Sequence, residues 1–289
     1  MFCCRTDLAL ERRDGLDEVP EGVVCREETR DGLHVTRIEV RDARGARALQ
    51  KPPGRYLTAE LEDGLLGEND WIWRAAQAVG ALLRPLLPAE GTVLAVGLGN
   101  RAVTPDALGP LCMEHLIVTR HLIERMPREF GGLRPVCALT PGVLGTTGIE
   151  TLELVRGAAA RVRPAAVVAV DALAARAMAR LCRTFQLSDT GIAPGSGAGN
   201  HRAALDRAAL GVPVIAAGVP TVVDALTLCA DLLGAPEELP AGAAAAAQML
   251  VAPKDVDLRV RRCAKALGYG LNLALQGGMT LSEMEQYLA

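Results

Sequence analysis

Aromatic residues are scarce in this sequence of 289 residues: phenylalanine, tryptophan and tyrosine together make up 3%, although 50% of the residues are hydrophobic. A core with so few aromatic side chains must be filled by alanine, valine and leucine. Such a core suits layers of helices and strands better than an all-β protein, whose strands favour aromatic and β-branched side chains. The composition therefore indicates an α/β protein, and the length allows one large or two small domains.

Other absences exclude several partners. The net charge is −3 and no long basic run is present, so the sequence does not predict direct binding to nucleic acid or to a membrane. No apolar stretch is long enough to span a bilayer, and Arg5, Asp7 and Glu11 interrupt the region where a signal peptide would lie. None of the eight cysteines forms a C-x-x-C pair, which argues against structural zinc and disulfide bonds. We therefore expect a soluble, cytoplasmic protein.

The first 70 residues are polar and rich in charge. Two extended runs flank Arg30-Asp31-Gly32, and an Asp-Gly pair tolerates the positive φ angles of a tight hairpin turn. Residues 54–61 could add a third strand. A helix should then begin at Asn69 or Asp70, since apolar residues follow at helical spacing. Residues 8–70 are therefore expected to form a small β-rich extension.

From Thr92 onward, short apolar strands alternate with amphipathic helices. The expected strands are 93–96, 134–139, 165–171 and 212–220; the expected helices are 106–126, 148–163, 172–181 and 254–275. This alternation predicts an open, mostly parallel sheet with helices on both faces, formed by residues 71–289.

The loop after the first of these strands begins like a nucleotide-binding loop. Gly97, Gly99 and Ala102 satisfy a relaxed dinucleotide fingerprint. However, Pro105 falls where the phosphate-binding helix should be established, and the next strand does not end in an acid for the ribose. No phosphate-loop motif of the G-x-x-x-x-G-K-[ST] type is present either, and no cofactor is expected.

Two carboxylates follow strand ends instead. Asp106 and Asp171 both sit at strand ends of neighbouring units, and Asp171 is the last residue of its expected strand, so the fold can bring both to one edge of the sheet. Two nearby carboxylates do not both ionise readily, so one can keep a proton while the other activates water. Both residues also precede helical sequence, however, and each could simply be a helix N-cap. The spacing alone leaves both interpretations open.

Other loop residues could support such a site. Asn100 and Thr104 could orient the first loop, and Arg176 could hold an acidic substrate or pair with Glu150. Residues 188–202 form a glycine-rich loop that could shape a cleft or bind an anion; this loop contains Asp189, which could be a third acid or a turn residue, and Ser196.

These motifs resemble the germination protease family (peptidase family A25), the spore endopeptidases. The resemblance covers most of residues 5–275 and is carried by VGLGN, VTPDALGP, RPVCALTPGVLGTTGIET, DALAAR, LSDTGIAPGSGAGNHR, GVPVIAAGVPTVVDA and APKDVDLRVRRCAKALGYGLNLAL. It implies an atypical aspartic-type endopeptidase in which Asp106 and Asp171 are the matching acids, on a phosphorylase/hydrolase-like core similar to that of hydrogenase maturation proteases.

The resemblance also implies a homotetramer that is made as a zymogen and degrades small acid-soluble spore proteins in the spore core. RTDLALE resembles the processing region, which places self-cleavage between Asp7 and Leu8 and makes residues 1–7 a propeptide. This propeptide is shorter than expected for the family, and so is the region after residue 240.

Two alternatives stay open. A hydrogenase-maturation type of endopeptidase would need a third metal-binding side chain beside the acids, from His115, His121 or His201. A non-catalytic protein could instead use the glycine loops to bind an anion or a nucleotide. No metal site is expected in the protease interpretation.

Overall fold

The computed structural model describes residues 5–62, 65–67, 70–194, 203–233, 246 and 248–288. Its strands are β1 (Val23–Arg30), β2 (Leu33–Val40), β3 (Gly54–Leu61), β4 (Val93–Gly97), β5 (Val136–Leu139), β6 (Ala166–Ala175), β7 (Thr184–Ser188), β8 (Val214–Asp224) and β9 (Leu250–Val251). Its α-helices are α1 (Ala9–Asp14), α2 (Ala43–Leu49), α3 (Trp71–Leu83), α4 (Leu108–Met113), α5 (Arg120–Arg125), α6 (Pro127–Phe130), α7 (Leu144–Thr147), α8 (Thr151–Val162), α9 (Arg207–Leu210), α10 (Ala225–Leu232), α11 (Val256–Gln276) and α12 (Leu281–Leu288).

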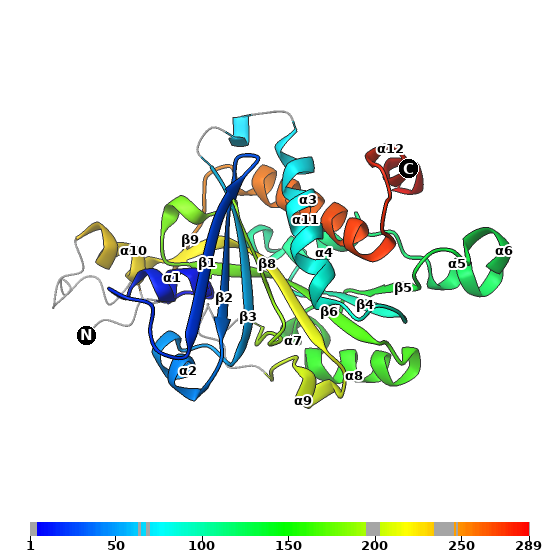
Figure 1. Cartoon of the computed structure of the whole chain (residues 1–289), viewed down its shortest axis with the longest axis horizontal. Helices are drawn as coiled ribbons and strands as arrows, with labels where there is room; N and C mark the ends of the chain where they lie inside the picture. The colour runs from blue at the N-terminus through cyan, green and yellow to red at the C-terminus, as the bar shows by residue number, and fades with distance from the viewer. Residues whose placement is uncertain are drawn as a thin grey trace.

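Within these described ranges the strands form a single open sheet, ordered β1-β2-β3-β7-β8-β6-β4-β5, with β9 paired to the end of β8. Strands β8, β6, β4 and β5 are parallel neighbours, whereas β1, β2, β3 and β7 add antiparallel strands to the same sheet. Helices cover both faces (Figure 1). The predicted α/β class and open sheet are confirmed, and the β-rich extension is continuous with the core sheet.

The alternation of side chains along the central strands creates two apolar layers. On β4, Val93 and Ala95 join the larger core cluster, which contains residues of α3, α4 and α11. Leu94 and Val96 join a second cluster, which contains Val155 of α8. All four side chains are nearly inaccessible. Because successive side chains point to opposite faces, a strand covered by helices on both sides must be apolar throughout.

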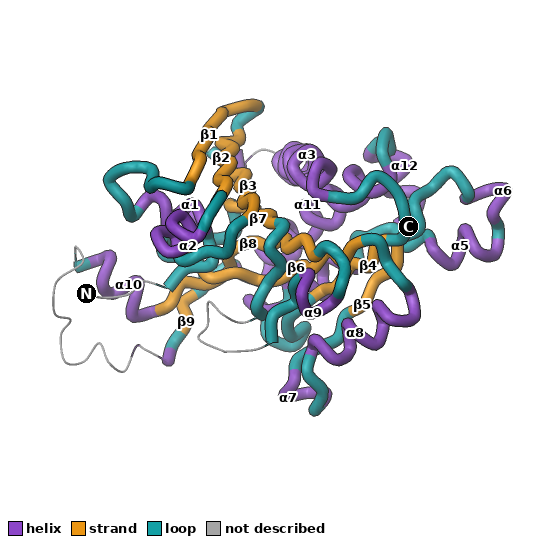
Figure 2. Tube along the Cα trace, turned by 60° about the horizontal axis from the view of Figure 1, so that its bottom comes forward, coloured by secondary structure: helices purple, strands orange, loops and turns teal. Residues whose placement is uncertain are grey.

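The predicted hairpin is confirmed. β1 and β2 pair in antiparallel register from Val23↔Val40 to Arg30↔Leu33. Asp31 and Gly32, between them, have φ angles of 54° and 74°. Two successive positive φ angles match the right-handed twist of the flanking strands, which is why Asp-Gly is favoured in such turns. Figure 2 shows this hairpin at one end of the sheet, beside α1 and α2, with α5 and α6 beyond β5 at the other end.

The long helix expected over residues 106–126 is wrong. The chain forms a short 3₁₀ turn at Thr104–Asp106, then α4, then a break before α5. Inside the break, the side chain of Asn272 on α11 accepts from the amide of Ile117 at 2.9 Å and donates to the carbonyl of His115 at 2.8 Å. This buried side chain replaces helical hydrogen bonds with tertiary ones, which a local pattern cannot reveal.

The helix expected over residues 172–181 is also wrong. β6 continues past Asp171 as far as Ala175, paired with β8 up to Val223. Alanine favours helices, yet parallel pairing with a neighbouring strand overrides that preference here. Because β6 continues, Asp171 lies within a strand, and no helix begins beside it. Strand β7 is a further element that the sequence pattern does not predict.

No described helix is both long and apolar enough to cross a membrane.

Candidate active site

Asp106 lies at the end of the loop that follows β4. Its Oδ2 atom accepts a hydrogen bond from the amide of Asn100 at 2.7 Å, so the loop folds back around the carboxylate. Gly99 makes this approach feasible: its φ is +104°, and a Cβ atom there would lie 2.1 Å from the carbonyl oxygen of Asp106. The hydroxyl of Thr221 on β8 holds the turn by donating to the carbonyl of Pro105 at 2.7 Å.

Asp171 lies on β6, in the middle of the parallel sheet, with a relative exposure of 4%. Its Oδ1 atom accepts from the amide of Ala172 at 2.9 Å. The residue paired with it on β8 is Gly218, where a Cβ atom would lie 2.5 Å from the carbonyl oxygen of Asp171. Close packing of the two strands therefore fixes the backbone of this acid.

Neither acid is a helix N-cap. The N-cap of α4 is Ala107, with no side-chain cap, and Asp171 is followed by four more strand residues. Both carboxylates instead line one cavity of about 360 Å³, which we call the acid cavity. Its other lining residues are mainly apolar, and most come from the loops after β4 and β5 and from β6 and β8. Asp171 is buried and Asp106 is half-buried, and neither carboxylate caps a helix.

A third carboxylate, that of Asp7, also lines the acid cavity. The amide of Asp7 donates to the carbonyl of Ala174 at 2.9 Å, and its Oδ2 atom accepts from the amide of Ala174 at 2.9 Å. The following residue, Leu8, is 0% exposed and packs with Leu173 and Val223. The N-terminal segment is therefore held to β6 at Ala174, through both the backbone and the side chain of Asp7.

The other side of this segment faces a second cavity of about 430 Å³, which we call the lysine cavity. Lys51 and Gln186 line it, and Asp7 and Asp171 line both cavities. The carbonyl oxygen of Asp7 accepts from Lys51 Nζ at 2.8 Å and from Gln186 Nε2 at 3.1 Å. Burial lowers the pKa of Lys51; Asp7 raises this pKa and Arg12 lowers it further. The peptide bond between Asp7 and Leu8 thus has two polar donors on its oxygen.

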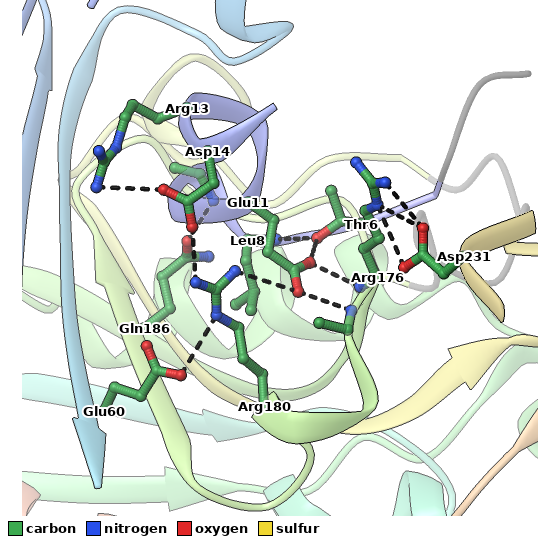
Figure 3. Close-up of polar contacts among 12 residues, drawn as sticks. Thr6, Leu8, Glu11, Arg13, Asp14, Glu60, Arg176, Arg180, Gln186 and Asp231 are labelled. Atoms are coloured by element: carbon green, nitrogen blue, oxygen red, sulfur yellow. Dashed lines mark hydrogen bonds and ion pairs between the residues drawn. The ribbon is translucent and has the colours of Figure 1, made fainter. Parts of the chain in front are cut away.

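A buried polar network anchors the chain just after this bond. The amide of Leu8 donates to Thr6 Oγ1 at 3.0 Å, and the Thr6 hydroxyl donates to the carboxylate of Glu11 (Figure 3). Glu11 also accepts from the amide of Arg176 at 2.7 Å and pairs with Arg180 at 3.5 Å. Because Glu11 is 4% exposed, these partners compensate for the loss of its hydration.

Several predicted site residues lie outside the two cavities. The side chain of Arg176 pairs with Asp231 at 2.8 Å, not with Glu150 (Figure 3). The carboxylate of Asp189 accepts from the backbone amide and the guanidinium of Arg55, both at 2.7 Å. Both side chains are therefore engaged in contacts that link separate elements of the fold.

The remaining predicted residues divide as follows. Asn100 acts through its backbone amide, and its side chain accepts from the amide of Ala102 at 3.0 Å. Thr104 is exposed in the turn before Asp106. Ser196 and His201 lie outside the described residues. Elsewhere His121 is exposed on α5, and the half-buried His115 packs edge-on against Tyr269. Among the described residues, no group of three or more His, Cys, Asp or Glu is arranged to hold a metal ion.

Sequence reasoning missed Lys51, Gln186 and Glu11. Lys51 follows a helix that the pattern did not predict, and Gln186 lies on the unpredicted strand β7. The available signal was weak: an isolated glutamine inside an apolar run such as TFQLS indicates a buried amide that needs partners.

Comparison with known proteins identifies the family of this chain. The family model described as germination protease matches residues 6–234. A germination protease of Caldanaerobacter subterraneus subsp. tengcongensis is 42% identical, with 98% of each chain covered. One of Clostridium perfringens strain SM101 is 38% identical, with 100% of each chain covered. One of Geobacillus sp. strain WCH70 is 43% identical over 81% of this chain and 67% of its own length. With its acids in one cavity and a match over most of its length, this chain belongs to the germination protease family, a family of peptidases.

Proposed function

We propose that this protein is an aspartic-type endopeptidase in which Asp106 and Asp171 activate a water molecule. The observation that carries the proposal is that both acids line one cavity together with Asp7, a residue of the chain's own N-terminal segment. A protease needs a nucleophile and a peptide held beside it, and here both parts meet at one place.

The chemistry follows from two carboxylates in one largely apolar cavity. One carboxylate accepts a proton from water as the water oxygen attacks the carbonyl carbon. The other, in its protonated form, donates its proton to the leaving nitrogen as the carbon–nitrogen bond breaks. Water and a peptide thereby become a carboxylic acid and an amine.

The first substrate is proposed to be the chain's own N-terminus. Asp7 holds β6 through both its amide and its carboxylate, and the Asp7–Leu8 bond lies where the two cavities meet. An acidic side chain before the cleaved bond is thus bound by the backbone of Ala174. Cleavage there would release residues 1–7 as a propeptide and leave the binding site of Asp7 beside β6 open to other proteins.

The natural substrates are proposed to be small acid-soluble spore proteins, cut during germination in the spore core by a homotetramer. The support is the family relationship and the seat for an acidic side chain beside β6. Asn100 keeps Asp106 in place through its amide, and Thr104 and Ser196 belong to loops proposed to shape the cleft. Arg176 and Asp189 are proposed to support these loops through Asp231 and Arg55.

The test uses the chain that starts at Leu8, as wild type and as Asp106→Asn, Asp171→Asn and Asp17→Asn variants; Asp17 is exposed and lies outside both cavities. Each is incubated with a small acid-soluble spore protein and a chelator, and fragment masses are read. We expect cuts after acidic residues by the wild type and by Asp17→Asn, and a loss of about 10³-fold or more in the two cavity variants. Equal cutting by Asp171→Asn would remove that acid from the mechanism, and cutting abolished by the chelator alone would favour a metal-dependent protease.

A further inference from the structure

The carbonyl oxygen of Asp7 is held by side chains from two distant parts of the sequence. Lys51 follows α2, and Gln186 lies on β7, yet their nitrogen atoms reach the same oxygen at 2.8 Å and 3.1 Å. Most buried backbone carbonyls in a fold are satisfied by backbone amides. Two side-chain donors converging on one carbonyl, beside a cavity that contains carboxylates, resemble the arrangement that enzymes use where negative charge develops.

The position of Lys51 is built into the fold. Gln50, the C-cap of α2, has a left-handed conformation with a φ of 53°, and its amide donates to the carbonyl of Ala46. This sharp end of the helix directs the next residue toward the lysine cavity. Burial there opposes hydration of the ammonium group and lowers the pKa of Lys51.

Gln186 has one orientation that satisfies both ends of its amide. Its Oε1 atom accepts from the amide of Ala9 at 2.7 Å, and its Nε2 atom donates to the carbonyl of Asp7. The side chain is 8% exposed, so few solvent contacts compete with these bonds. The acceptor contact with Ala9 therefore fixes the donor on the Asp7 oxygen in advance, which is what preorganised catalysis requires.

We propose that Lys51 and Gln186 are catalytic residues that bind the oxygen of the scissile carbonyl and stabilise the oxyanion formed there. This inference rests on the proposed function, in which water attacks the Asp7 carbonyl carbon. As the new carbon–oxygen bond forms, the electron pair of the carbonyl moves onto its oxygen, and the water proton moves to a cavity carboxylate. The ammonium and the amide N–H groups hold the negative oxygen until the carbon–nitrogen bond breaks and the carbonyl is restored.

The same two donors serve substrates in trans. Lys51 and Gln186 both belong to the part of the chain that remains after residues 1–7 are lost. The two donors that bound the Asp7 carbonyl can then bind the carbonyl of an acidic residue in another protein. The same pair of donors would thus bind the scissile carbonyl in both reactions, first in self-cleavage and later in the cleavage of substrates after acidic residues.

The test compares two variants with matched shapes. Lys51→Met keeps the length of the side chain and removes its donors. Gln186→Glu keeps the acceptor for Ala9 and removes the donor to Asp7. Lys254→Met, at an exposed position in the turn before α11, is the control. Self-cleavage of the full chain is followed by intact mass, cutting of a small acid-soluble spore protein by the chain starting at Leu8, and folding by thermal unfolding.

We expect both variants to melt near the wild-type temperature and to lose about 10²-fold to 10³-fold in the rate of self-cleavage and in kcat on the protein substrate. The control should match the wild type. Wild-type rates in both variants, or a rise in KM with kcat unchanged, would overturn the inference and leave the proposed function in place. A wild-type chain that cuts neither itself nor the substrate would overturn both. If one variant fails to fold, the cleavage rates of the other variant test the inference.

Discussion

A methyl group added at Gly99 would collide with the backbone carbonyl of Asp106. A Cβ atom there lies 2.1 Å from the carbonyl oxygen of Asp106, at a φ of +104° that L-residues rarely adopt. Gly99→Ala should therefore displace Asp106 and lower the cleavage rate by about 100-fold. It should also reduce the free energy of unfolding by about 1–3 kcal/mol. Cleavage kinetics and urea denaturation measure the two effects.

The matched control is Gly157→Ala. Gly157 lies within α8, and a Cβ atom there meets nothing within 4 Å. Because alanine favours a helix over glycine, this change should raise the free energy of unfolding by about 0.5–1 kcal/mol and leave cleavage unchanged. If Gly99→Ala behaved like Gly157→Ala, the loop would not depend on the contact between Gly99 and Asp106.

The lowered pKa of Lys51 gives a dependence of stability on pH. Burial shifts this pKa below its ordinary value of 10.5, so between the two values the unfolded chain binds more protons than the folded one. The free energy of unfolding should therefore rise with pH across this window. Lys51→Met should remove that gain. Urea denaturation from about pH 7 to pH 10, with both proteins carrying Asp171→Asn so that they stay whole, measures the difference. If the difference in the free energy of unfolding between the two proteins did not change with pH, the pKa of Lys51 would not be lowered in the folded chain.

At this scale the sequence indicates acids better than their partners. Asp106 comes after the apolar run of β4 and Asp171 after the apolar residues 166–170, which is a local feature, so their placement beside one cavity could be anticipated from the sequence. Lys51 and Gln186 meet at one oxygen only because β7 lies beside β3 and β8 in the folded sheet. No spacing along the chain contains that information.

Among the elements, the break between α4 and α5 depends on one side chain. Asn272 is 0% exposed and satisfies the amide of Ile117 and the carbonyl of His115. Asn272→Ala should leave both groups without these bonds and lower the free energy of unfolding by about 2–4 kcal/mol, measured by urea denaturation. Gln286→Ala, at an exposed position on α12, should change it by less than about 0.5 kcal/mol. Similar values for both would show that water replaces Asn272.

The strands and helices that the pattern predicted correctly are those with one dominant local signal. β4 is uniformly apolar, and the hairpin turn contains an Asp-Gly pair. The failures have tertiary causes. β6 stays extended through an alanine-rich stretch because β8 pairs with it, and the helix after Asp106 stops because Asn272 replaces its hydrogen bonds.

For the whole molecule, the position of the N-terminus predicts the kinetic order of the proposed self-cleavage. The Asp7–Leu8 bond already lies against the cavities of its own chain. Self-cleavage should therefore be first order, with the same half-life over a dilution of about 100-fold. Intact mass spectrometry of diluted samples measures it. A half-life that lengthens in proportion to dilution would show that one molecule cuts another, and an inactive Asp171→Asn chain cut by the wild type would show the same.

The N-terminal segment against β6 has a further consequence for the history of each molecule. A tethered peptide occupies its seat at an effective concentration of about a millimolar or more, so foreign chains compete poorly while it is present. Hydrolysis consumes this competitor once and cannot restore it, because residues 1–7 diffuse away. On the proposed function, every molecule is therefore first inhibited by its own N-terminal segment. Its first turnover removes this segment irreversibly and activates the molecule toward other proteins.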